Sequence, residues 1–276
     1  MNNNLDENLD EYIDDLDFFV NFRSSPCGYF EDRTNDYIVL TRDMADSDVI
    51  SNDVNNPNAQ FKTPEELKTM YFARVDYFLN MGFRRSKDMY YGNLCRSCSR
   101  CIPIRVPVKD FILTPRFQRI LKKNSDIRIE IRDSEVTDEK IKLFQKYNEI
   151  RHENTGDCLE HLLSIHTGYV GTKEMNYFID DKLVAVGILD LAKTSVSSNY
   201  FYFDPDYSDR SLGVFSTLKE IEFTKENDKT FYYLGFYIEE SDKMRYKSEF
   251  QPAQVRIKEK WVDFDKTNLT VYKSSN

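Results

Sequence analysis

Alternating apolar and polar residues predict a series of β-strands in the second half of the chain. Ile127, Ile129 and Ile131 alternate with charged residues, which is the period of a half-buried strand. Four later apolar runs predict further strands, and a tight turn joins the first two of them. The predicted strands cover residues 127–131, 175–179, 183–191, 196–203 and 231–237.

Apolar residues at helical spacing predict helices between and before these strands. Thr63 is a favourable N-cap, Glu66 completes a capping box, and the 3.6-residue period then continues until Gly82. We therefore expect Arg84 and Arg85 in a loop at the exit of this helix. Further helices are predicted over residues 137–152, 158–169 and 211–225.

The order of these elements predicts the fold class. Antiparallel strands followed by a helix and one more strand are similar to the α+β core of GNAT acyltransferases. We predict an N-terminal, cysteine-containing basic domain over residues 1–132 and a GNAT-like acyltransferase domain over residues 133–276. Within the first domain, residues 16–22 are expected to form a strand and the Asn- and Asp-rich residues 43–62 a surface loop.

Composition narrows the class of protein. The 276 residues contain no apolar run near the ~20 residues that span a bilayer, and the acidic N-terminus lacks the pattern of a signal peptide. Five cysteines is an odd number, and three of them lie three residues apart, which argues against a secreted disulfide framework. We expect a cytoplasmic protein without a membrane partner.

Charge is distributed unevenly along the chain. The net charge is −9, yet residues 84–132 hold 13 Lys and Arg against 4 Asp and Glu, whereas residues 1–83 hold 6 against 17. Phosphate binding depends on local cationic density, because each neutralised phosphate releases counterions. With Phe83, Tyr90 and Tyr91 available to stack on bases, the basic block predicts an RNA-binding surface; the alternative is a solvated charged face.

The cysteines suggest a metal site. Cys95, Cys98 and Cys101, with the distant Cys27, would supply four thiolates for Zn²⁺ or a [4Fe–4S] cluster. The alternative is that they are reduced packing thiols or a redox-sensitive knuckle.

A coenzyme A site is disfavoured by the sequence before the helix at 211–225. Acetyl-CoA-dependent GNAT enzymes carry the pattern [Gln/Arg]-x-x-Gly-x-[Gly/Ala], which Arg210 and Gly213 match. Phe215 stands where a small residue is needed for backbone to approach the pyrophosphate. The helix N-terminus remains available to a tRNA phosphate, although Ser211 is expected to cap it.

A set of short motifs resembles the aminoacyl-tRNA–protein transferase family, whose members add Arg or Leu to protein N-termini. The motifs follow the family's order, although residues 114–117 depart from its usual Ser-basic-Ser-Gln. They lie at residues 26–33, 82–86, 95–101, 102–108, 121–124, 147–152, 202–205, 211–213, 234–238 and 243–247.

The resemblance implies transfer of an amino acid from a charged tRNA to the α-amino group of proteins that begin with Asp or Glu, which creates a degradation signal. The compact length favours leucine, with arginine as the other donor, and no cofactor is required for transfer. Two alternatives are a CoA-dependent GNAT acetyltransferase and a noncatalytic RNA-binding module with a metal knuckle.

Candidate residues follow from this chemistry. An acidic first residue requires a cationic pocket, and the transfer requires groups that position the amine and the ester. The catalytic candidates are Asp204, Glu222 and Tyr246; the acceptor-binding candidates are Arg84, Arg85, Arg105, Arg151 and Lys247; the tRNA-binding candidates are Arg119, Lys122, Lys123, Ser211 and Gly213.

Overall fold

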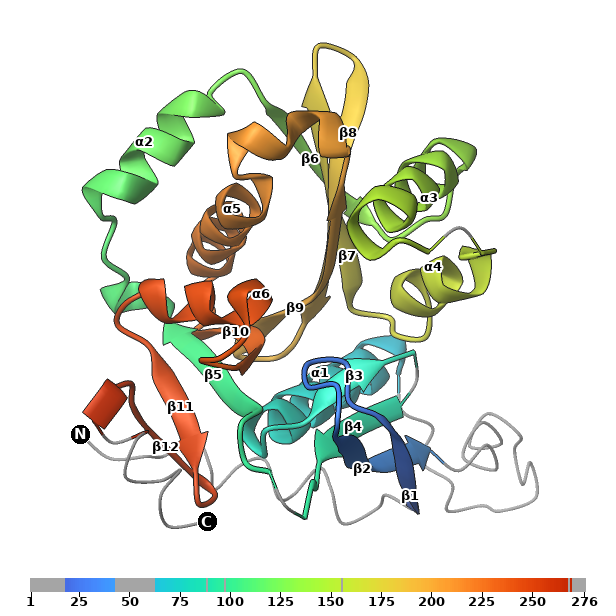
Figure 1. Cartoon of the computed structure of the whole chain (residues 1–276), viewed down its shortest axis with the longest axis vertical. Coiled ribbons are helices and arrows are strands. Elements are labelled where there is room, and N and C mark those ends of the chain that lie inside the picture. The colour runs from blue at the N-terminus through green and yellow to red at the C-terminus, as the bar shows by residue number, and fades with distance from the viewer. Residues whose placement is uncertain are drawn as a thin grey trace.

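The computed structural model describes residues 18–42, 63–87, 89–96, 98–154, 156–267 and 269, which form two sheets with helices around them (Figure 1). The loop expected at 43–62 and the start of the strand expected at 16–22 lie outside these residues. The first described strand extends further than expected, to Pro26.

The smaller sheet is antiparallel and comes from the N-terminal part of the chain. Its order is β1-β2-β4-β3, with β1 (Phe18–Pro26), β2 (Thr34–Arg42), β3 (Arg84–Ser86) and β4 (Met89–Asn93). Helix α1 (Pro64–Asn80) begins with the predicted capping box of Thr63 and Glu66. Gly82, at φ 86°, lets the chain turn after α1. The expected loop at Arg84 and Arg85 is wrong, because both residues belong to β3.

The larger sheet has eight strands in the order β12-β11-β5-β10-β9-β8-β7-β6. Neighbouring strands in it are antiparallel except for the pair β9 and β10, which is parallel. Its strands are β5 (Ile102–Pro107), β6 (Arg128–Asp133), β7 (Thr172–Ile179), β8 (Lys182–Leu191), β9 (Ser195–Phe203), β10 (Phe231–Tyr237), β11 (Gln254–Ile257) and β12 (Lys260–Asp263).

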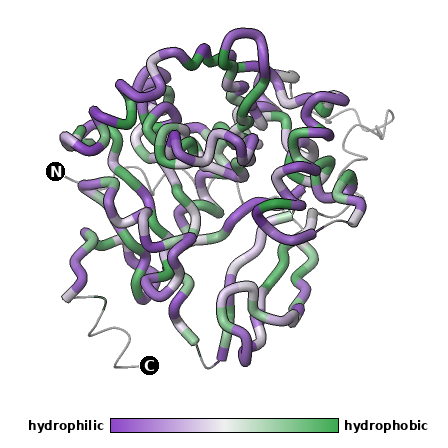
Figure 2. Tube along the Cα trace, turned by 45° about the horizontal axis from the view of Figure 1, so that its top comes forward, coloured by the Kyte–Doolittle hydropathy of each residue, from purple (hydrophilic) through white to green (hydrophobic). Residues whose placement is uncertain are grey.

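Helices cover both faces of this sheet (Figure 1). Helices α2 (Pro115–Lys123) and α5 (Leu212–Glu226) lie on one face and α3 (Asp138–His152) and α4 (Leu159–His166) on the other. Hydrophobic and hydrophilic stretches alternate along these helices, as expected when one side of each packs on the sheet (Figure 2). Short helical segments lie in the connections between these helices and strands: η3 (Val108–Asp110), η4 (Pro205–Arg210), α6 (Asp242–Arg245) and η5 (Tyr246–Glu249).

The element order confirms the predicted GNAT-like α+β core. Strands β6 to β9 form an antiparallel meander, and α5 then connects β9 to the parallel strand β10. The expected domain boundary at 132/133 falls inside β6, and β5 pairs with β10 and β11. Residues 102–132 therefore contribute two strands to the same sheet as the second half of the chain.

A buried ion pair joins α3 to this sheet. Lys140 Nζ is paired with Glu174 on β7, and His166 Nδ1 lies 3.5 Å from the same carboxylate. Burial alone would raise the pKa of Glu174, but hydrogen bonds from His166, Lys140 and Asn176 outweigh it and lower the pKa to about 2. The carboxylate is therefore ionised at all ordinary pH values.

Removing Lys140 should destabilise the fold. Lys140→Ala leaves the Glu174 charge without its partner and should cost about 3 kcal/mol in the free energy of unfolding, measured by urea titration. The exposed Lys142→Ala on the same helix should stay within about 0.5 kcal/mol. Because the folded pKa of Glu174 is depressed, its contribution is complete above the unfolded value of about 4.3 and is lost as pH falls towards 2. Equal stabilities of Lys140→Ala and Lys142→Ala would contradict the predicted role of the Lys140–Glu174 pair.

Candidate active site

The neighbouring parallel strands β9 and β10 separate after a short stretch of pairing. Their ladder joins residues 195–197 to residues 231–233. Both strands are irregular just beyond it: the β8–β9 register shifts next to Ser198, and the β10–β5 register shifts between Tyr233 and Gly235. Strands that part in this way leave main-chain groups for side chains or ligands to bond. We call the region around Ser198 and Gly235 the strand gap.

Arg84 reaches the strand gap from β3. Its Nη2 donates a hydrogen bond to the Ser198 carbonyl oxygen on β9. Its Nη1 lies against Gly235 on β10, where a Cβ would be only 2.6 Å from that nitrogen. Gly235 also has φ 92°, so both its backbone and its neighbour require glycine. The Nη1 atom is buried and has no hydrogen-bond partner.

A buried carboxyl group lies beside the gap on α5. Ser216 Oγ donates to Glu220 Oε1 at 2.5 Å, and the Tyr232 hydroxyl donates to Oε2. The Ser198 side chain also bonds to Glu220. Burial raises the pKa of Glu220 to about 7, although these hydrogen bonds favour the carboxylate and lower the pKa. Gly187 makes room for the group, since a Cβ there would lie 3.1 Å from Oε1.

Lys247 and Tyr246 close the same region from η5. Lys247 Nζ donates to the Phe236 carbonyl oxygen at 3.0 Å and is buried. Burial lowers the pKa of Lys247 to about 7, and repulsion by Arg84 acts in the same direction. Burial likewise raises the pKa of Tyr246 to about 12, with Glu220 adding to the shift. The gap thus gathers one fixed cation and two groups whose charge changes near neutral pH.

The structure does not bring the five expected acceptor cations together. Arg85 points away from Arg84, as successive strand residues do, and forms a buried bidentate pair with Asp190 at 2.9 and 2.6 Å. Arg105 is buried against Phe231, Tyr233 and Trp261.

Arg151, the fifth of these cations, is exposed on α3, 5.9 Å from the Phe203 ring. Of the five expected cations, Arg84 and Lys247 are the two that lie at the strand gap.

The expected catalytic carboxylates lie away from it. Asp204 is buried at the start of η4, 2.5 Å from Lys146 Nζ and 2.8 Å from Lys182 Nζ. Burial alone would raise the pKa of Asp204, but these hydrogen bonds outweigh it and hold the pKa below its usual value. Glu222 is exposed on α5 and pairs with Lys219. Glu220, two residues earlier on the same helix, was not predicted.

Three of the tRNA-binding candidates, Lys123, Ser211 and Gly213, lie at the N-terminal end of α5. Helix α2 exposes Arg119, Lys122 and Lys123. Lys123 Nζ lies 2.7 Å from the carbonyl oxygen of Asp209, two residues before Ser211. Lys123 also pairs with the Asp209 carboxylate at 3.0 Å. Helix α2 therefore places one cation beside a helix N-terminus, which is itself favourable for phosphate, and exposes Arg119 and Lys122 on the same helix.

The α5 terminus differs from expectation in two details. Ser211 has φ 56° and its side chain makes no capping hydrogen bond, so the expected cap is wrong. Phe215 is buried in the core, 6.0 Å from the Tyr177 ring, so its bulk does not face the helix end. The space around Gly213 is open, because a Cβ there would meet no atom within 4 Å.

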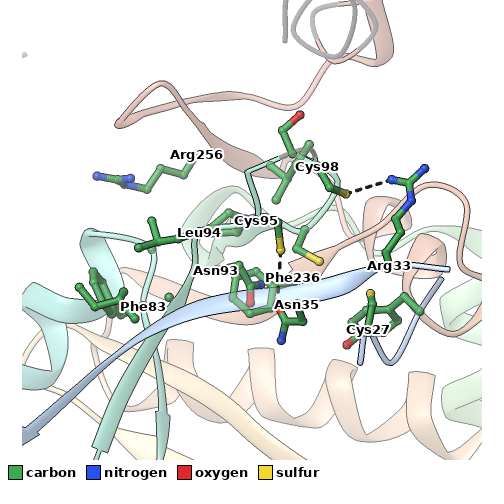
Figure 3. A pocket seen from close by; sticks show the side chains of 18 of the residues that line it. Cys27, Arg33, Asn35, Phe83, Asn93, Leu94, Cys95, Cys98, Phe236 and Arg256 are labelled. Atoms are coloured by element: carbon green, nitrogen blue, oxygen red, sulfur yellow. Dashed lines mark hydrogen bonds between the residues drawn. The ribbon is translucent and has the colours of Figure 1, made fainter. Parts of the chain in front are cut away.

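The four cysteines of the expected metal site line one pocket of about 470 Å³. Cys27 comes from the turn after β1, and Cys95 and Cys98 come from the segment between β4 and β5 (Figure 3). Cys101 belongs to the same segment. Arg33 Nη1 donates to Cys98 Sγ at 3.3 Å. Burial raises the pKa of the Cys101 thiol to about 12, and the other three thiols act in the same direction.

Two family models match the chain. The N-terminal model of arginine-tRNA-protein transferase matches residues 25–119, and its C-terminal model matches residues 139–257. The aspartate/glutamate leucyltransferase of Hahella chejuensis is 33% identical over 187 residues, 66% of this chain and 80% of the relative. The aspartate/glutamate leucyltransferase of Shewanella amazonensis is 36% identical over 209 residues, which cover 74% of this chain and 86% of the relative. The chain belongs to the arginine-tRNA-protein transferase family.

This result confirms the family resemblance carried by the short motifs and the prediction that the protein is a transferase. Solved structures resemble the chain only loosely. FemX is 9% identical, and the match covers 82% of this chain and 81% of FemX with a TM-score of 0.40. L-PGS from Bacillus licheniformis is 10% identical, and the match covers 84% of this chain and 76% of L-PGS with a TM-score of 0.39. The strand order and the α5 crossover therefore remain the evidence for the fold. Among the described residues, no helix is long and apolar enough to cross a bilayer.

The four thiols do not fit a metal ion as they are placed. Within the described part of the chain, no three His, Cys, Asp or Glu side chains converge on a metal position, and all five cysteines are free. A thiol with a raised pKa is also a poor ligand until an ion displaces its proton. The metal site remains a prediction.

Metal analysis tests this prediction. If Cys27, Cys95, Cys98 and Cys101 bind an ion or cluster, protein purified without oxygen should contain it stoichiometrically, and Cys98→Ser should lose it. The buried Cys158→Ser should retain it. Background metal content in fresh anaerobic protein would identify the four residues as packing thiols.

Proposed function

We propose that this protein transfers leucine from leucyl-tRNA to the α-amino group of proteins that begin with Asp or Glu. The observation that carries the proposal is the match of both halves of the chain to family models, together with curated relatives that bear the name aspartate/glutamate leucyltransferase. The product would carry leucine as its first residue and so a degradation signal. The donor is a cytoplasmic molecule, which supports the expected location.

The arrangement of charge supports a donor that approaches along α5. Lys123 lies beside the α5 N-terminus, Arg119 and Lys122 are exposed on the same helix α2, and the C-terminal half of α5 carries Glu220 to the strand gap. A tRNA whose phosphates contact the first group would extend its 3′ end along the helix towards the second. Arginine forks and lysines both suit phosphate, and the helix dipole adds to the attraction.

The transfer itself needs alignment more than a strong catalyst. The acceptor α-amine has a pKa near ~7.7–8.0, so a useful fraction is neutral at cell pH. Holding amine and ester together can supply about 7–11 kcal/mol of the barrier. Arg84 suits the acidic side chain of the acceptor, because its Nη1 is buried and has no hydrogen-bond partner.

Arginine is the second candidate donor, favoured by the description of the matching family models as arginine-tRNA-protein transferase. One assay distinguishes the candidates. Purified protein is incubated with an Asp-initiated peptide and tRNA charged with labelled leucine or labelled arginine, and an acetyl-CoA reaction is run in parallel. We expect label in the peptide from leucyl-tRNA. Label from arginyl-tRNA alone would overturn the choice of leucine, and acetylation alone would overturn the tRNA-dependent reaction.

Loss of the α2 cations should weaken tRNA binding. Lys122→Ala with Lys123→Ala removes two phosphate contacts, so the slope of log K against log salt should fall by about 1–2 and affinity should drop. Lys225→Ala, at the opposite end of α5, is the matched control and should bind as the wild type does. An unchanged salt slope in the double variant would place the tRNA on another surface.

A further inference from the structure

Glu220 and Arg84 lie on two sides of one residue without bonding to each other. The Ser198 carbonyl oxygen accepts from Arg84, and the Ser198 side chain bonds to Glu220. The hydrogen bonds that Glu220 accepts come from hydroxyl groups, and within the described part of the chain no lysine, arginine or histidine forms an ion pair with it. The gap therefore contains a guanidinium nitrogen without a hydrogen-bond partner beside a buried carboxyl group that is bonded to hydroxyl groups, and the Arg84 charge favours the ionised form of that carboxyl group.

Such an arrangement lowers the stability of the fold. A buried carboxylate with only neutral donors and a buried guanidinium nitrogen without an acceptor are both poorly compensated for the loss of water. Folding alone would favour an ion pair or apolar groups at these positions. A buried polar atom that lacks a partner, as Arg84 Nη1 does, commonly belongs to a binding or catalytic site, where the ligand supplies the missing partner.

The chemistry of the two groups defines the ligand. A protein that begins with Asp or Glu presents an α-ammonium group and a carboxylate on the same residue. One fixed cation and one carboxyl on opposite sides of Ser198 complement that pair. A ligand with only a carboxylate would bring Glu220 no cationic partner, and an ionised Glu220 would repel that carboxylate.

We propose that Glu220 binds the α-ammonium group of the acceptor and takes its proton, while Arg84 binds the acidic side chain of the same residue. This inference rests on the proposed function and names the acceptor site within it. The acceptor enters between β9 and β10 beyond residues 197 and 233, where the ladder between the strands has ended.

The proton balance is complete without a co-reactant. The ammonium group gives one proton to the Glu220 carboxylate and becomes a neutral amine. The amine nitrogen attacks the ester carbonyl carbon, the new C–N bond forms, and the C–O bond to the tRNA ribose breaks. The second proton lost by the nitrogen ends on the departing ribose oxygen. Glu220 releases the first proton to solvent when the product leaves.

The pH dependence has a definite sign. Glu220 accepts a proton only when ionised, and burial raises its pKa to about 7, so kcat should rise with pH through about 7. Five titratable or charged groups face this region from the packed elements. They are Arg84 on β3, Tyr177 on β7, Tyr232 on β10, and Tyr246 and Lys247 on η5. Lys247 titrates in the same range, so the assignment requires variants of Glu220 itself.

Transfer kinetics provide the first test. Glu220→Gln keeps the shape of the side chain but cannot take up a proton, and it should lower kcat roughly 100-fold, with loss of the inflection near pH 7. Glu220→Asp should retain the inflection at a reduced kcat. Glu226→Gln, exposed on the same helix, is the control and should match the wild type. Folding of each variant is checked by thermal unfolding. A folded Glu220→Gln with wild-type kcat and pH profile would overturn the proposal.

Peptide binding gives a second test that needs no transfer. Calorimetry compares an Asp-initiated peptide with its N-acetylated form. The wild type should bind the free amine about tenfold more tightly, Glu220→Gln should bind both equally, and Arg84→Gln should lose the preference for Asp over Asn. A wild type that does not distinguish free from acetylated peptide would overturn the proposal. Amine-selective binding without leucyl or arginyl transfer would instead support this site and refute the proposed function.

Discussion

The bidentate pair between Arg85 and Asp190 fixes the relation of the two sheets. Arg85 lies on β3 of the smaller sheet and Asp190 on β8 of the larger one, and both side chains are almost fully buried. Asn199 Nδ2 donates to the same carboxylate at 2.9 Å, which ties the irregular part of β9 to this pair. Because neighbouring strand residues point in opposite directions, anchoring Arg85 directs Arg84 into the strand gap. The gap thus depends on an ion pair that takes no part in the chemistry.

Much of the fold follows from local patterns. The period-two strands, the Thr63 capping box and the antiparallel meander before α5 all depend on short stretches whose burial is uniform along one face. What the patterns could not predict are pairings between distant segments. Residues 102–107 form a strand that joins β10 and β11, more than 120 residues later, and no local period encodes that partner.

The sequence predicts the types of residue at the candidate site better than it predicts which residues lie there. Arginines that interrupt apolar stretches were expected to bind substrate, yet Arg85 and Arg105 satisfy partners from remote strands, which a single sequence does not reveal. Glu220 was missed although a signal exists. Ser216, Glu220 and Thr224 follow each other at four-residue spacing, so they form a polar line along the otherwise apolar buried face of α5. A carboxyl on such a line is a better candidate than Glu222, on the solvent side.

The placement of β5 has a consequence for how this molecule can be divided. The strand comes from the first half of the chain but lies between β10 and β11 of the second half. A fragment that starts after residue 132 would leave β10 and β11 without the strand that joins them. Their unpaired main-chain groups could then pair with other chains, which leads to aggregation. The two halves of the chain are therefore not interchangeable modules, because a chimera joined after residue 132 would have to form the β5 pairings with β10 and β11 between segments of two different proteins.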